Sequence, residues 1–237
     1  MLKYNISAKV LEMYPGYVRG VVIGEGLRNG LEEQPELVTL LREAEDRVMV
    51  RADLENIAEH PRIGSWRAAY GKFGARPSKF FSSIEALARR VRKGGQLPYI
   101  NDLAAIGNIY SLRHLAPVGG HDVGDVQHDL WLTLAEGDEL FTPFGTDEVE
   151  KPEPGEVVYL DGKTVLCRRW TWRQAEATKL VAESHHVAIN VDGLPPVTFA
   201  EVQDICEEMA ERVSRFCGGR TICRYLMEGS PAIDLKV

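Results

Sequence analysis

The spacing of apolar residues in this 237-residue chain changes character near residue 115, and that change limits the folds open to it. Before residue 115, apolar side chains recur every three or four positions, which is typical of helices with one buried face. After it, short apolar runs predict strands over 130–135, 156–160, 164–169 and 187–191. Helices grouped ahead of strands favour an α+β fold over an alternating parallel sheet.

We therefore predict a single compact α+β domain over residues 1–237, with helices packed on a mixed or antiparallel β-sheet. The helices within residues 80–114 should pack on a sheet formed mainly after Leu130. The segment from Lys9 to Ile23 alternates loosely, and the strand at its end should join the same α+β unit.

Short motifs predict where several elements begin and end. Ser82-Ser83-Ile84-Glu85 and Thr198-Phe199-Ala200-Glu201 each match a capping box, so a helix should start at each. Asp161-Gly162 is a hairpin signal between two of the predicted strands. Tyr99–His114 should form another helix, and the small-residue stretch Leu115–Asp122 after it should form a loop.

Composition excludes several classes of protein. No apolar run approaches the roughly 18 residues of a membrane span, and the first residues lack a signal-peptide pattern. None of the cysteines form a Cys-x-x-Cys pair, which disfavours a disulfide framework or a zinc knuckle. Buried, reduced thiols and a cytoplasmic location are the expectation; the cysteines are Cys167, Cys206, Cys217 and Cys223.

Charge is distributed unevenly along the chain. The formal net charge is -7, yet nine basic residues lie between Arg62 and Lys93 with Glu85 as the only acid there. Such a segment can present a phosphate-attracting face on an otherwise acidic protein. A structural explanation is also open, because cations in the last turn of a helix complement its dipole. Arg89, Arg90, Arg92 and Lys93 would occupy such a turn.

Three further segments carry residue types suited to chemistry. In Leu115–Asp122, Gly119 and Gly120 could expose backbone N–H groups while His121 and Asp122 orient a water or hydroxyl; a mobile turn is the alternative. In Cys167–Gln174, tryptophans alternate with arginines, which suits nucleic-acid stacking or a cluster at a sheet edge. Thr178–His186 contains adjacent histidines, which on a strand would face opposite ways, so we expect no metal site there.

Several strings, taken in order, resemble the B3/B4 domain family, which includes the tRNA-editing domain of the phenylalanyl-tRNA synthetase β-subunit and short stand-alone proteins. The resemblance covers roughly residues 60 to 195. It rests on Trp66–Gly74, Ser82–Val91, Leu97–Leu103, Asn108–Leu112, Pro117–Asp122 and Cys167–Gln174.

The resemblance implies hydrolysis, in trans, of the ester of a mischarged aminoacyl-tRNA, with no cofactor and no aminoacylating activity. Gly120, His121 and Thr178 would then be catalytic, and Gly119, Asp122 and Glu183 would bind substrate. The family loop usually reads Pro-x-His-x-x-Asp, so Asp122 matches while Gly119 stands at the histidine position. The expected partner is tRNA, contacted by Arg67, Lys72, Arg76, Lys79, Arg168 and Arg169.

A second interpretation remains open on these residues. The same cavity could serve a non-catalytic module that binds tRNA or an amino acid, because the residues that line a pocket serve both purposes. The residues leave the amino acid and the tRNA undetermined.

Overall fold

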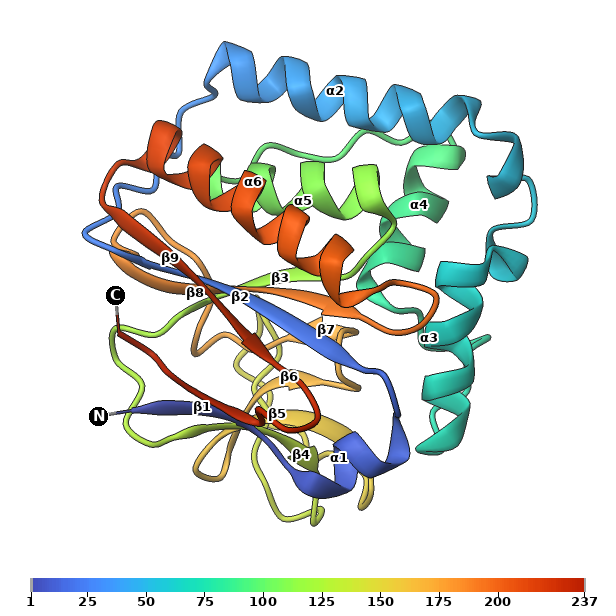
Figure 1. Cartoon of the computed structure of the whole chain (residues 1–237), viewed down its shortest axis with the longest axis vertical. Coiled ribbons are helices and arrows are strands. Elements are labelled where there is room, and N and C mark those ends of the chain that lie inside the picture. The colour runs from blue at the N-terminus through green and yellow to red at the C-terminus, as the bar shows by residue number, and fades with distance from the viewer. Residues whose placement is uncertain (1, 237) are drawn as a thin grey trace.

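A computed structural model of the chain describes residues 2–236 and contains two β-sheets stacked face to face, with a layer of helices outside one of them (Figure 1). The four-stranded sheet is antiparallel throughout and lies between the helices and the second sheet. Its order is β3 (Val118–Asp122), β8 (His186–Gly193), β2 (Val18–Glu25) and β9 (Arg220–Leu226).

The six-stranded sheet forms the opposite layer. One pair of neighbours, β1 and β4, is parallel and the others are antiparallel, so the sheet is mixed. Its order is β10 (Ala232–Asp234), β1 (Lys3–Ile6), β4 (Leu130–Leu134), β5 (Val157–Asp161), β6 (Thr164–Arg168) and β7 (Arg173–Gln174). The Asp161–Thr164 pair closes the predicted hairpin between β5 and β6.

The helices cover the outer face of the four-stranded sheet and one side of the molecule. Helices α5 (Asp102–His114) and α6 (Phe199–Cys217) pack on this sheet, and α2 (Pro35–Val50) lies over α5 on the far side (Figure 1). The remaining helical elements are α1 (Ala8–Met13), two short 3₁₀ turns (Ala52–Leu54 and Ile57–Glu59), α3 (Pro61–Lys72) and α4 (Ser83–Arg92). The prediction of an α+β fold is confirmed, and so is the inclusion of the strand that contains Ile23.

Local capping explains where the helices of the site begin. Thr198 and Glu201 form a complete capping box at α6, and Ser82 Oγ accepts from the Glu85 N–H at α4. Helix α5 begins at Asp102 rather than at Tyr99, because the Asn101 side chain accepts from the Ala104 N–H at 2.8 Å and so fixes the first turn.

The structure places a short helix, Ala8–Met13, in the loosely alternating segment ahead of β2, and it differs from the sequence prediction at one further place. The expected loop at Leu115–Asp122 is instead largely strand β3, which pairs with β8 along the edge of the four-stranded sheet. Two adjacent glycines favour a loop by propensity, but the ladder with β8 and the packing of α5 outweigh that preference.

A buried ion pair within the four-stranded sheet contacts an aromatic ring of the second sheet. Arg19 on β2 is 0% exposed, and its guanidinium donates to Asp192 Oδ1 from Nε at 2.9 Å and from Nη2 at 2.6 Å. The Arg19 guanidinium carbon also lies 4.1 Å from the centre of the Tyr159 ring on β5. Burial alone would lower the pKa of Arg19, but the Asp192 carboxylate raises it above its ordinary value. Arg19 therefore remains charged at the floor of the space between the sheets.

Candidate functional site

Two adjoining cavities lie along the edge strand β3, where α5, the four-stranded sheet and the segment around β7 meet. The inner cavity, of about 180 Å³, reaches between the sheets to Tyr159, Asn190 and Asp192. The outer cavity, of about 400 Å³, opens over the first half of α5. Both are bordered by Val118, Gly119, Gly120, Trp172, Arg173 and Gln174, so we treat them as one groove.

The two adjacent glycines of β3 serve different purposes. A Cβ on Gly120 would lie 2.6 Å from Leu180 Cδ1, so only glycine lets the Leu180 side chain pack against the strand. A Cβ on Gly119 would meet no atom within 4 Å. Gly119 lies on the same face of β3 as His121, which lines the inner cavity, so its missing side chain leaves that cavity open.

The edge of β3 offers backbone groups to the groove. Gln174 Nε2 donates to Gly120 O at 2.7 Å, and the Asp122 N–H donates to Thr178 O at 3.1 Å, so these groups point away from β8. In an antiparallel ladder the N–H and C=O of one residue point the same way. The Gly120 N–H is therefore also directed away from β8, toward the segment that carries Gln174.

His121 and Thr178 form a buried polar pair beside the inner cavity. His121 is 4% exposed, and its Nδ1 lies 2.8 Å from Thr178 Oγ1. Burial, helped by the positive charge of Arg19, lowers the pKa of His121 to about 4. The imidazole is thus neutral near pH 7, so one of its nitrogens donates a hydrogen bond and the other accepts one.

Two of the expected substrate-binding residues lie outside the groove. Asp122 is held by Ser184 Oγ, which donates to Oδ2 at 2.6 Å, and by the Gly124 N–H, which donates to Oδ1 at 2.9 Å. It occupies the face of β3 opposite His121, because side chains alternate along a strand. Glu183 is exposed, and neither carboxylate borders either cavity. The structure therefore brings Gly119, Gly120 and His121 to one cavity, with Thr178 behind the imidazole.

Residues that the sequence did not single out also face the inner cavity. The side-chain atoms Asn190 Oδ1 and Tyr159 Oη are buried and have no hydrogen-bond partner within residues 2–236. An unsatisfied buried polar atom costs about 1–3 kcal/mol, so these atoms are suited to a ligand or water. The position of Asn190 inside the otherwise apolar run Val187–Val191 was the available sequence signal.

Cys167 also borders the inner cavity but is not suited to nucleophilic attack. Burial raises the pKa of its thiol to about 12, so the reactive thiolate is scarce at neutral pH. The four cysteines are free, and three of them are buried. A water molecule is a better nucleophile for this groove than the thiol.

A strained turn links the inner cavity to the basic residues. Arg169 and Trp170 both have positive φ values, 47° and 63°, in a region that costs on the order of 1–3 kcal/mol for a residue with a side chain. Trp170 is fully buried and packs edge-on against Tyr14, Tyr17 and Trp66, which holds the turn in place. This is the cluster at a sheet edge that the sequence left open.

The six expected tRNA-contacting side chains fall into two groups. Arg67 is paired with the buried Glu85, Lys72 donates to Met13 O, and Arg168 is buried and paired with Glu156 and Glu150. Three others border a separate hollow of about 390 Å³ between the segment that follows α3 and the turn before β5; they are Arg76, Lys79 and Arg169. We call this the basic hollow.

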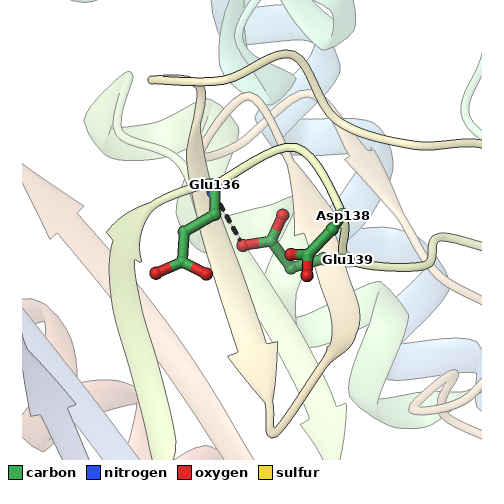
Figure 2. Close-up of side chains that lie close together, drawn as sticks. All are labelled: Glu136, Asp138 and Glu139. Carbon is green, nitrogen blue, oxygen red and sulfur yellow. Dashed lines mark hydrogen bonds between the residues drawn. The ribbon is translucent and has the colours of Figure 1, made fainter.

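A cluster of three acidic residues elsewhere in the fold is paired with a lysine. Glu136, Asp138 and Glu139 have carboxylate oxygens within 4.8 Å of one another in the turn after β4 (Figure 2). Lys163 donates to Glu136 at 2.9 Å and to Asp138 at 2.7 Å, and Glu139 accepts the N–H groups of Glu136 and Gly137. These contacts account for the turn through ion pairs and backbone capping.

Comparisons with known proteins place the chain in a family. None of the described helices is long and apolar enough to cross a membrane. A search of curated protein sequences gave no match. Among solved structures, the chain is similar to an N-terminal fragment of the phenylalanyl-tRNA synthetase β-subunit from Pyrococcus horikoshii, with 14% identity and a TM-score of 0.45 over 93% of this chain. The chain spans 52% of that fragment. The family model of the B3/4 domain matches residues 65–220, and the chain therefore belongs to the B3/4 domain family.

Proposed function

We propose that the chain hydrolyses the ester bond of a mischarged aminoacyl-tRNA, acting in trans. The observation that carries the proposal is the groove along β3, where the Gly119–Gly120 backbone and the buried His121 border one cavity and Thr178 contacts the imidazole from behind. Membership of the B3/4 domain family supports the choice of substrate.

In this proposal the inner cavity receives the aminoacyl group and the outer cavity receives the terminal nucleoside. Asn190 Oδ1 and Tyr159 Oη, which lack partners among the described residues, would take hydrogen bonds from the polar groups of the amino acid. Trp172 and the 53% exposed Phe144 border the outer cavity and offer ring faces to a base. Because Asp122 and Glu183 lie outside both cavities, they are replaced here by Asn190 and Tyr159.

The chemical step would use water. A water oxygen attacks the ester carbonyl, the bond to the ribose oxygen breaks, and the products are the free amino acid and the tRNA hydroxyl. The Gly120 N–H would donate to the developing oxyanion, a contact that typically changes rates by about 10²–10³. With a pKa of about 4, His121 is a weak base, so its role with Thr178 is to orient the water.

A non-catalytic binding module is the second candidate, and one observation favours it. No carboxylate that is free of an ion pair is found among the residues bordering the inner cavity; the acid there is Asp192, which Arg19 holds. A site without a strong general base could bind an aminoacyl group without cleaving it.

Deacylation of a panel of mischarged tRNAs by the purified chain separates the two candidates. Turnover on at least one member, reduced at least tenfold in Thr178→Val and restored in Thr178→Ser, supports hydrolysis. Valine keeps the size of the side chain without the hydroxyl, and serine is one methyl group smaller but keeps the hydroxyl that contacts His121. Tight binding of mischarged tRNA with no turnover on any member would reject the hydrolase and leave the binding module.

A further inference from the structure

The basic hollow lies outside the proposed catalytic groove and contains an arginine held in an unusual way. The Arg169 guanidinium lies 3.7 Å from the Phe80 ring centre and 4.5 Å from that of Trp172. Its side chain is 9% exposed. Because aromatic rings contact the guanidinium, polar partners are best placed at its edge.

The hydrogen-bond donors at the edge of the Arg169 guanidinium are only partly paired. Arg169 Nη2 lies 3.5 Å from Glu156 Oε2, a long contact, while Nη1 is buried with no hydrogen-bond partner in the described part of the chain. Glu156 accepts shorter bonds, of 2.9 and 2.8 Å, from Arg168. Burial lowers the pKa of Arg169 from its ordinary value, yet a guanidinium stays charged at neutral pH. A buried, charged donor without a partner is well suited to an anionic ligand.

The rim of the hollow supplies further charge. Arg76 and Lys79 are exposed and border the hollow with Arg169. Two acids border it as well: Glu156, which Arg168 also holds, and the exposed Glu153, which opposes an anion. Three cations around one hollow fit a phosphate group, which accepts several charge-assisted hydrogen bonds at once.

We propose that the basic hollow binds a phosphate group, and that its source is a phosphodiester of an RNA strand whose 3′ end enters the groove. Trp172 connects the two places, because one ring contacts Arg169 and also borders both cavities of the groove. The phosphate site follows from Arg169 and its neighbours alone. Only the choice of RNA as its source rests on the proposed function.

The test uses binding, with no hydrolysis, and places its changes on the exposed rim so that folding is preserved. Binding of inorganic phosphate is measured by calorimetry. Binding of a labelled tRNA that carries no amino acid is measured by fluorescence anisotropy. The chain and its variants Lys79→Gln, Glu153→Gln and Lys93→Gln are compared. Lys93 is exposed and does not border the hollow, so its variant is a matched control for charge.

We expect Lys79→Gln to weaken the binding of both ligands by about three- to tenfold. For tRNA, the slope of the log binding constant against log salt concentration should become shallower by about one. Glu153→Gln should tighten both ligands, because it removes the opposing charge. Lys93→Gln should leave phosphate binding unchanged. The proposal is supported in full if both phosphate and tRNA rank the three variants by affinity in this order.

Other outcomes overturn it in part or entirely. If phosphate follows the ranking while tRNA does not, RNA is rejected as the source and the hollow takes free phosphate. If neither ligand distinguishes Lys79→Gln from Lys93→Gln, the phosphate site itself is rejected. Because this tRNA carries no aminoacyl ester, none of these results depends on whether the chain hydrolyses esters.

Discussion

The edge strand β3 and the turn at residues 168–172 border the same groove, but they are built in opposite ways. Strand β3 presents two residues without side chains, so it contributes backbone groups and open volume. The turn presents large aromatic and cationic side chains, held by the buried Trp170 and by ion pairs to Glu156. We infer that the largest losses of stability come from disturbing the turn, that substitutions at His121 and Gly120 of β3 cost less, and that a substitution at Gly119 alters mainly the shape of the groove.

The largest expected effect on stability comes from removing Glu156, which holds two arginines of the turn. This buried carboxylate pairs with Arg168 and Arg169 and accepts the Arg169 N–H at 3.0 Å. Glu156→Ala would leave buried guanidinium groups without their main partner, so we expect a loss of about 3–5 kcal/mol in the free energy of unfolding. Urea denaturation measures it. Glu150→Ala is the control, because Glu150 is partly exposed and should cost about 1 kcal/mol or less. Equal losses in both variants would contradict this view of the turn.

The next effect concerns His121 on β3 and the dependence of stability on pH. Its pKa is about 4 in the folded chain, against about 6.5 in an unfolded chain, so the unfolded state binds the proton first as pH falls. The folded state is therefore at its full stability above pH ~6.5 and should lose about 3 kcal/mol as pH falls to about 4.

Unfolding free energies measured at intervals between pH 7 and pH 4 test this for the chain and for His121→Gln. The variant should show a flatter curve over that interval, whatever its stability at pH 7. Parallel curves would show that His121 titrates normally and is not buried in its neutral form.

Gly120→Ala should have a moderate effect on stability. Its Cβ would lie 2.6 Å from Leu180 Cδ1, so the leucine must move, and overpacking of this kind costs about 1–3 kcal/mol. The melting temperature should fall accordingly. A Gly120→Ala, Leu180→Ala double variant provides the space for the new methyl group. It should therefore show a smaller effect of the glycine substitution than the native background does.

Gly119→Ala should have the smallest effect on stability and yet impair function. The new Cβ meets no atom within 4 Å, and the backbone there is extended, so we expect a change within about 0.5 kcal/mol. If the inner cavity receives the aminoacyl group, the methyl group should reduce deacylation at least tenfold. Gly71→Ala, an exposed helical glycine whose Cβ also meets open space, is the matched control. Unchanged deacylation in Gly119→Ala would place the substrate elsewhere.

Local patterns allowed much of the fold to be predicted. The N-caps at Ser82 and Thr198, the Asp161-Gly162 hairpin and the long helical periodicities involve residues close in sequence, so their consequences are visible without the fold. The division into two sheets was not predictable in this way. It depends on pairings such as β1 with β4 and β2 with β8, which join distant segments.

The candidate site was predicted in part for the same reason. Gly119, Gly120 and His121 were identified as a group because they are adjacent, and they do border one cavity. Asp122 is adjacent too, but the strand geometry turns it to the other face, where Ser184 binds it. Tyr159 and Asn190 were missed because they come from β5 and β8, which meet at the cavity only through the stacking of the two sheets.

The sequence by itself determined the fold class, the family and the segments that carry polar chemistry, since each depends on residue type and short-range spacing. Only the tertiary structure decided which basic residues are engaged. Arg67 and Arg168 are as basic in sequence as Arg76, yet buried carboxylates hold both of them. The reason is physical: a charge gains a partner or remains open to a ligand according to what lies within a few ångströms, and long-range packing sets those distances.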